Sequence, residues 1–157
     1  MSEHHARVSW TAGEAGFRRG RFTRVHRWTF DGGLEVAASA SPAVIPAPWS
    51  DAAAVDPEEA FVAAVASCHM MSFLFLANRA GLDVVDYDDE ASGMLAADAE
   101  GRYAITEVVL RPRVTFAAGQ APDDDQLAGL HHEAHDTCYI ANSVRTAIRV
   151  APRDATD

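Results

Sequence analysis

The chain has 157 residues, of which 48% are hydrophobic and 23% are charged, a composition typical of a single soluble globular domain. Its 13 basic and 23 acidic side chains give a formal net charge of −10, which argues against a general nucleic-acid-binding surface. The N-terminal stretch MSEHHARVSW lacks the apolar segment of a secretory signal, so we expect a cytoplasmic protein. In a reducing compartment, two cysteines indicate buried thiols, metal ligands or redox-active thiols more than a structural disulfide.

Three short strands are predicted in the first 40 residues. The first covers residues 7–11, and the second covers residues 21–30, where apolar side chains alternate with polar ones. The third covers residues 34–39 and follows Asp31-Gly32-Gly33, a sequence typical of a hairpin turn. Residues 41–55 contain three prolines and are predicted to form a loop.

A long helix is predicted from Pro57 to about Arg79. Asp56 is a favourable N-cap residue, and Glu59 lies at the position that completes a capping box. Gly81 follows the last turn and suits the left-handed residue that commonly ends a helix.

This helix is apolar on every side. No residue from 60 to 77 is charged, and a stretch of that length is at the lower limit for a membrane span. Ser67, His69 and Ser72 interrupt it, so we interpret it as a core helix and expect no membrane association. A helix that is apolar all round needs cover on all sides, which predicts a partner subunit.

The C-terminal half is predicted to contain two strands, a second helix and a last strand. The two strands cover 83–97 and 102–117, and Pro112 predicts an edge position or a bulge in the second. The helix begins near Pro122, and the last strand covers 144–150. The resulting order of elements predicts an α+β fold in which a mostly antiparallel sheet packs on helices.

Cys68 lies in the middle of the long helix, where it is either a packing residue or a reactive thiolate. The helix dipole has little effect this far from a helix end, so a thiolate would need a nearby cation. His69 points about 100° away from Cys68 on the helix and does not supply it. Arg24, on the second predicted strand, is a candidate, although a solvated strand face explains Arg24 equally well.

Cys138 lies at or just after the end of the second helix, 70 positions from Cys68, so the two cysteines form no local motif. A metal site is an alternative for this segment. His131, His135 and Cys138 are spaced i, i+4 and i+7, which on one helix could present three ligands on one face.

The stretches DPEEAFVAAVASCHMMSFLF and HHEAHDTCYIANS resemble the two cysteine segments of the OsmC/Ohr family. FTRVHRWTFDGGLEV, the following SASP and the later YDDEASG resemble its OsmC-like branch, and the resemblance covers roughly residues 6–150. It implies an intertwined homodimer, built on the long central helix, with two active sites at the subunit interface. It also implies a thiol-dependent peroxidase that uses a dithiol reductant and no cofactor to reduce organic hydroperoxides or hydrogen peroxide.

The resemblance also implies roles for particular residues. Cys68 would be the peroxidatic thiol, which forms a sulfenic acid, and Cys138 the resolving thiol, which closes a disulfide with it. The active-site glutamate would be Glu58, and the active-site arginine would be Arg24, with Arg27 as the second choice. Glu58 lies ten residues before Cys68 on the helix, about 15 Å along its axis, so we expect it to serve the active site of the partner subunit.

Two features depart from the family pattern. The PAPWSD loop and the Met70-Met71 pair differ from the best-known peroxidases of the family and fit its OsmC-like branch. Tyr139 follows the second cysteine, where many members of the family have proline. The OsmC-like branch also includes proteins without established activity, so a non-catalytic dimer that binds an apolar ligand is the alternative to a peroxidase.

Overall fold

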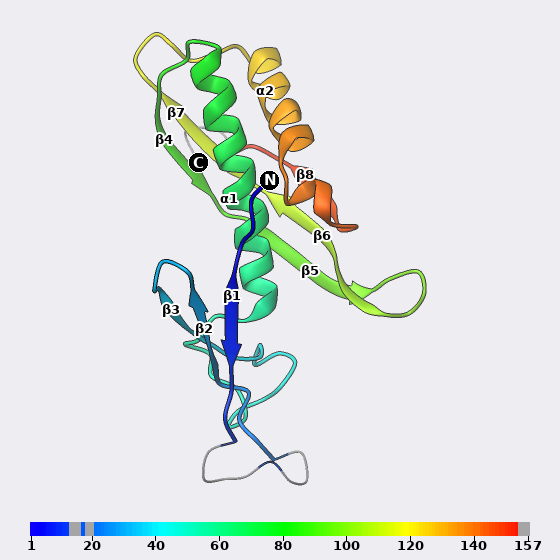
Figure 1. Ribbon diagram of the computed structural model, residues 1–157. Helices are drawn as coiled ribbons and strands as arrows, with labels where there is room; N and C mark the ends of the chain where they lie inside the picture. The colour runs from blue at the N-terminus through cyan, green and yellow to red at the C-terminus, as the bar shows by residue number, and fades with distance from the viewer. Residues whose placement is uncertain (13–16, 18–20, 154–157) are drawn as a thin grey trace. The chain divides into compact units, whose positions relative to one another are not determined.

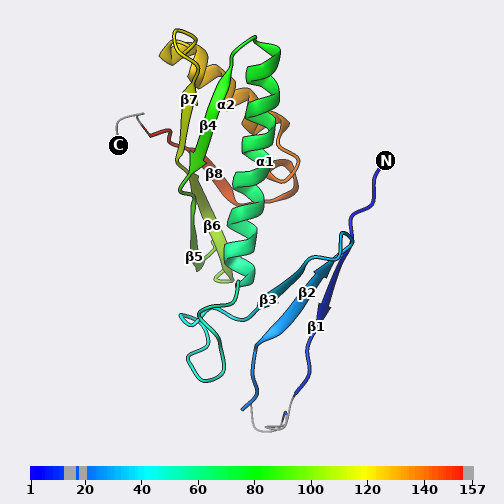
Figure 2. The same ribbon diagram turned by 90° about the vertical axis from the view of Figure 1, so that its left-hand side faces the viewer.

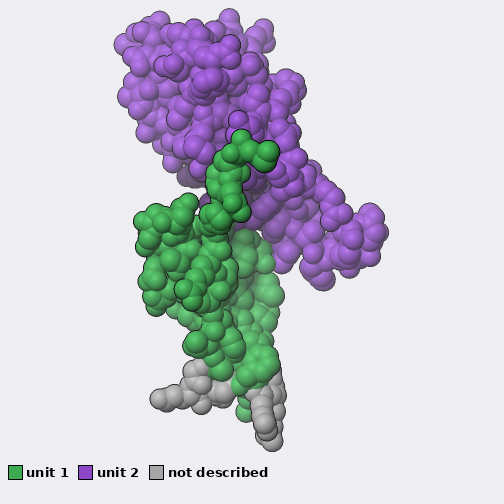
Figure 3. All heavy atoms as spheres, in the orientation of Figure 1, with its two compact units in different colours: residues 1–60 green, residues 61–157 purple. Residues whose placement is uncertain are grey.

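We describe a computed structural model, which covers residues 1–12, 17 and 21–153. Contacts divide the chain into two compact units, Met1–Ala60 and Phe61–Asp157 (Figure 3). Each unit is described by itself.

The first unit contains a three-stranded antiparallel sheet in the order β1-β2-β3 (Figure 1). The strands are β1 (Ala6–Ser9), β2 (His26–Phe30) and β3 (Glu35–Ala38), which confirms the three predicted strands and the hairpin between the last two. The second strand is shorter than predicted. It begins only at His26, because the Arg24 amide donates a hydrogen bond to the Trp49 carbonyl of the following loop, at 2.8 Å, and not to a neighbouring strand.

Helix α1 (Pro57–Arg79) has the predicted bounds and the predicted capping box. Asp56 Oδ1 accepts the Glu59 amide at 2.7 Å, and Glu59 Oε2 accepts the Asp56 amide at 3.2 Å. Gly81, with φ of 76°, has the left-handed backbone expected just after the helix end. Helix α1 runs without interruption from Pro57 to Arg79 (Figure 2).

The second unit contains four strands where two long ones were predicted. Residues 83–97 form β4 (Val84–Asp89) and β5 (Ser92–Ala97), and residues 102–117 form β6 (Tyr103–Leu110) and β7 (Pro112–Phe116). The second long strand breaks before Pro112, which has no amide proton for a ladder. The adjacent Arg111 amide donates to the Asp89 carboxylate at 2.6 Å.

The pairing of these strands is mostly antiparallel, as predicted. β4 pairs with β7 and β5 with β6, both antiparallel, whereas β8 (Ala147–Val150) joins β6 in parallel. Helix α2 (Asp124–Thr137) begins after Asp123, whose side chain accepts the Gln126 amide at 2.8 Å. A short 3-10 helix, η2 (Ala141–Ser143), follows it.

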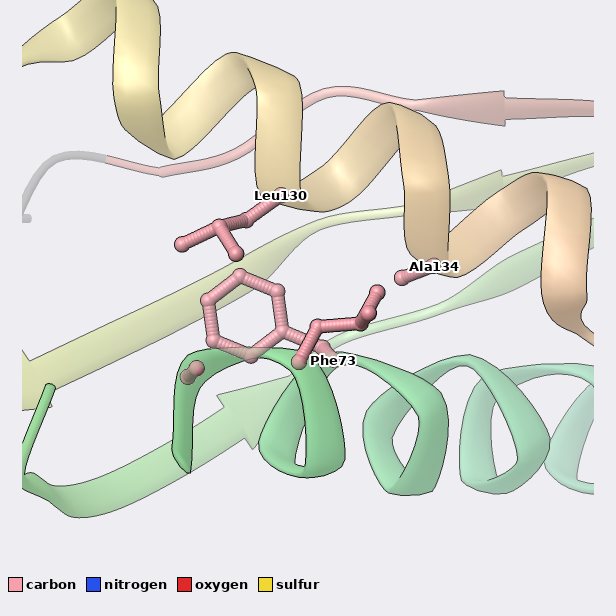
Figure 4. Packing of buried hydrophobic residues seen from close by; sticks show 5 residues of the cluster. Phe73, Leu130 and Ala134 are labelled. Atoms are coloured by element: carbon pink, nitrogen blue, oxygen red, sulfur yellow. The ribbon is translucent and has the colours of Figure 1, made fainter. Parts of the chain in front are cut away.

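Two apolar clusters pack α1 against the rest of the second unit. In the first, Phe73 of α1 contacts Leu130 and Ala134 of α2 (Figure 4), with side chains of β4 and β7 around them. In the second, Val65 of α1 packs on Val108 and other residues of β6 and β8. The face of α2 that carries Leu130 and Ala134 is therefore the face that meets α1.

Part of α1 remains uncovered within the chain. Met71 and Phe75 are 59% and 62% exposed, and only a third of the apolar stretch of α1 is buried. By length and composition alone, α1 could cross a membrane. The core helix of a soluble protein meets the same two criteria. A partner subunit that covers this face stays a prediction.

Candidate active site

The second unit brings the two cysteine thiols into contact. Cys68 lies on α1, and Cys138 is the C-cap residue of α2, with an extended backbone (φ −70°, ψ 113°) that turns its side chain away from the helical path. Both thiols are free and buried, and they lie close enough for Cys68 to raise the pKa of the Cys138 thiol. Two residues 70 positions apart therefore share one site. Such proximity is needed for the Cys68–Cys138 disulfide that the family resemblance implies.

The environments of the two thiols differ. Cys68 is 9% exposed and Cys138 is 1% exposed. Burial raises the pKa of the Cys138 thiol, and the neighbouring Cys68 side chain raises it further. The Ala141 amide donates to the Cys138 sulfur at 3.4 Å and fixes its position. Cys138 therefore holds its proton at neutral pH, and Cys68 is the thiol with more access to a small molecule.

A buried histidine pair lies next to this dithiol, and the sequence did not reveal it. His69 Nε2 and His131 Nδ1 are 3.1 Å apart, and their rings lie nearly parallel, at 8°. His69, which the helix geometry turns away from Cys68, is fully buried. Burial lowers the pKa of both His69 and His131 to about 4, so both rings are neutral at pH 7.

The alternative of a three-ligand metal site is wrong. Among residues 1–12, 17 and 21–153, no group of three or more His, Cys, Asp or Glu side chains is arranged to hold a metal ion. The reason is the end of α2. The helix stops at Thr137, so Cys138 leaves the face that His131 and His135 share and turns to Cys68 instead.

Arg24 borders an apolar cavity of about 350 Å³ in the first unit. Its guanidinium lies over the Phe22 ring, 3.7 Å from the centroid, and Nη1 donates to the Phe22 carbonyl at 2.5 Å. Trp10, Phe17 and Phe22 contact one another around this cavity, with ring centroids 4.6–5.7 Å apart. His26 and Trp28 lie on one face of β2, where Trp28 Nε1 donates a hydrogen bond to His26 Nε2 at 2.9 Å.

The two candidate arginines are in different settings. Arg27 forms an exposed ion pair with Glu35, with Nη1 and Oε2 2.6 Å apart, an arrangement typical of a surface contact. Arg24, beside the cavity, is the better candidate for an active-site cation. Glu58 is half-buried in the first turn of α1. Arg24 and Glu58 belong to the first unit and the cysteines to the second, so their joint role in one site stays a prediction.

Comparison with known proteins identifies relatives of the whole chain. A family model described as OsmC-like protein matches residues 50–153, whereas no curated protein matches the chain. An OsmC-like protein of unknown function from Vibrio cholerae superposes with a TM-score of 0.94 at 46% identity, over 98% of this chain and 100% of that one.

Two more distant structures carry a functional description. An organic hydroperoxide resistance protein from Elizabethkingia anophelis, with thiocyanate bound, has a TM-score of 0.72 at 17% identity, over 99% of this chain and 96% of that one. A putative organic hydroperoxide resistance protein from Vibrio cholerae, with captopril in one of its active sites, has a TM-score of 0.69 at 20% identity, over 99% and 94% of the two chains. At these identities the likeness shows a common fold. The α+β fold predicted from the sequence is thereby confirmed.

Proposed function

The chain belongs to the OsmC-like protein family, and from this premise we propose that it is a thiol-dependent peroxidase that reduces organic hydroperoxides. The observation that carries the proposal is the contact between the Cys68 and Cys138 thiols. A buried pair of free thiols in contact is chemically poised to form a disulfide. Distant relatives of the same fold are hydroperoxide resistance proteins, which supports a peroxide as the oxidant.

We assign Cys68 as the peroxidatic thiol and Cys138 as the resolving thiol. Cys68 is the more exposed of the two, so a peroxide reaches it first. Cys138 is enclosed, and burial keeps its pKa above the ordinary value, which disfavours the thiolate needed for a direct attack. The family resemblance assigns the same order.

The reaction runs in three balanced steps. The Cys68 thiolate attacks one oxygen of the hydroperoxide, the O–O bond breaks, and the departing alkoxide takes a proton to become an alcohol. Cys138 condenses with the resulting sulfenic acid, which releases water and forms the Cys68–Cys138 disulfide. A dithiol reductant then reduces this disulfide by exchange and is itself oxidised to a disulfide.

Free thiols suit a reducing compartment, so we propose that the protein acts in the cytoplasm.

Arg24 and Glu58 complete the proposed site. A guanidinium favours the thiolate form of a cysteine beside it, and Arg24 already borders a cavity with an aromatic wall. An apolar cavity of this kind fits the alkyl or aryl group of an organic hydroperoxide better than it fits hydrogen peroxide. The resemblance implies an active-site role for Glu58, and its separation of about 15 Å from Cys68 along α1 favours the active site of the partner subunit.

The site requires a homodimer under this proposal. Ala64, Met71 and Phe75 are exposed and, with the small polar Ser67 between them, are spaced by three or four residues on α1, so they form one largely apolar stripe along the helix. Small residues in such a stripe allow a second helix to approach closely. A second copy of the chain is the proposed occupant, in agreement with the resemblance, and the relative with captopril bound has more than one active site.

A non-catalytic ligand-binding dimer is the second candidate. The cavity of the first unit is apolar and could hold a ligand without any thiol chemistry, and the relative at 46% identity has no established function. The two candidates differ in the reactivity of Cys68.

The discriminating experiment follows the consumption of cumene hydroperoxide by the protein with dithiothreitol as reductant. The wild-type protein should turn over, and Cys68→Ser should lose all of its turnover. Cys138→Ser should still consume one equivalent in a single turnover, because its Cys68 reaches the sulfenic acid. Equal background rates for the wild-type protein and Cys68→Ser would favour the ligand-binding dimer.

A further inference from the structure

The histidine pair between α1 and α2 takes no part in the reaction above, yet it is tightly held. His69 is 1% exposed and His131 is 4% exposed, and Nε2 of the first lies 3.1 Å from Nδ1 of the second. The Phe73 ring stacks on His131, with centroids 4.4 Å apart and planes at 25°. Both imidazole rings are therefore fixed in position and in orientation.

The hydrogen bond between the rings leaves the other nitrogen of each ring buried and without a partner. Each neutral imidazole has one N–H donor and one bare nitrogen. The remaining two nitrogens, His69 Nδ1 and His131 Nε2, are buried and have no hydrogen-bond partner. Whichever ring donates in the shared bond, the other ring keeps a buried N–H without an acceptor. A pair of apolar side chains would avoid this penalty, so packing alone does not account for two histidines here.

Both rings are neutral at physiological pH. Burial is the main cause that lowers the pKa of His69 to about 4, and the neighbouring His131 and His135 lower it further. Burial also lowers the pKa of His131 to about 4. The contact is thus a neutral, directional N–H···N hydrogen bond at pH 7.

The pair joins the same two helices as the dithiol. His69 directly follows Cys68 on α1, and His131 lies seven residues, about two turns, before Cys138 on α2. Each helix therefore contributes one histidine and one cysteine. A hydrogen bond that fixes α2 on α1 at His131 also limits how far the end of α2, with Cys138, can move from Cys68.

We propose that the His69–His131 hydrogen bond is a positioning contact for the dithiol, which keeps Cys138 within disulfide-forming reach of Cys68. This positioning role rests on the proposed function, in which Cys68 and Cys138 must form a disulfide. A disulfide tolerates only a narrow range of Cα separations, about 4.4–6.8 Å, so a small displacement of α2 is enough to prevent closure. Loss of the hydrogen bond lowers the effective concentration of the Cys138 thiol at Cys68.

The test measures the dithiol–disulfide equilibrium of the full-length protein in glutathione buffers. In this reaction the two thiols and one glutathione disulfide give the Cys68–Cys138 disulfide and two glutathione thiols. The variant His69→Phe keeps a ring but loses the hydrogen bond, whereas His69→Gln keeps an amide nitrogen near the position of Nε2. We expect His69→Phe to lower the equilibrium constant for disulfide formation about tenfold, about 30 mV, and His69→Gln to stay within about twofold of the wild type.

Several results would overturn the inference. One is an unchanged equilibrium constant in folded His69→Phe, and another is an equal loss in His69→Gln, which would assign the effect to ring packing. If His69→Phe does not fold, His131→Phe and His131→Asn give the same comparison from α2, with the same expected contrast. A wild-type protein that forms no Cys68–Cys138 disulfide also overturns it. Oxidation of the dithiol by glutathione disulfide needs no hydroperoxide, so a protein inert to hydroperoxides would refute the proposed function while leaving this comparison intact.

Discussion

The buried histidine pair predicts a loss of stability in mild acid. In the unfolded chain His69 and His131 titrate near 6.5, whereas burial lowers both pKa values to about 4 in the folded protein. Between pH 4 and 6.5 the unfolded state therefore binds more protons than the folded state. The stabilisation from neutral burial is complete above pH 6.5 and is lost progressively as the pH falls towards 4.

The magnitude follows from these two pKa values. For one ring, moving from pH 7 to pH 5 lowers the free energy of unfolding by about 2 kcal/mol. Two rings would double this loss, but His131 lines a cavity of about 400 Å³, and solvent there screens part of the charge. We therefore expect a loss of about 2 kcal/mol for the pair. His135 of α2 is a further, smaller cause of the lowered pKa of His69.

Urea unfolding at pH 7 and pH 5 measures this effect. The control is the double variant His69→Gln, His131→Asn, which has no titrating ring at either position and keeps the same carboxylates. The free energy of unfolding of the wild type should fall by about 2 kcal/mol more than that of the control over this interval. If the free energy of unfolding had the same pH dependence in the two proteins, burial of the neutral histidines would not be the cause of the acid sensitivity.

Three further predictions concern packing, capping and the active-site cation. A Cβ atom on Gly93 would lie 2.6 Å from the Val62 side chain, so Gly93→Ala should lower the free energy of unfolding in urea by about 1–3 kcal/mol, while Gly32→Ala, with open space around it, should leave it unchanged. Asp123→Ala removes the N-cap bond of α2 and should cost about 1 kcal/mol in the same assay; an unchanged midpoint would contradict the capping role. Arg24→Met should slow the reaction of Cys68 with cumene hydroperoxide at least about tenfold in stopped-flow measurements, whereas Arg27→Met should react at the wild-type rate, and the reverse order would reassign the cation.

Local signals in the sequence were sufficient to predict α1 with its ends. Its caps depend on residues within three or four positions of the helix termini, so Asp56, Glu59 and Gly81 determine them without help from the rest of the fold. The breaks that divide two predicted strands into β4 to β7 could not be predicted in this way. They depend on contacts such as the one between the Arg111 amide and Asp89, 22 positions apart.

The site shows the same limit. The resemblance assigns Cys68 and Cys138 to one site, and in the structure Cys68 lies close enough to Cys138 to raise the pKa of its thiol. The pairing of His69 with His131 could not be predicted from periodicity, which indicates the side of its own helix that a side chain takes but not the side chain of another helix that it meets. A usable signal was available, since a histidine in an apolar helix needs a polar partner, and a second histidine in an apolar stretch of α2 was a candidate.

The most direct test of the central claim is the intact mass of the reduced protein after one equivalent of cumene hydroperoxide. A peroxidase that uses these two cysteines should lose about 2 Da and retain no titratable thiol, with a Cys68–Cys138 disulfide in the peptide map. In Cys138→Ser, dimedone should trap the sulfenic acid of Cys68. An unchanged mass with both thiols still titratable would contradict the central claim.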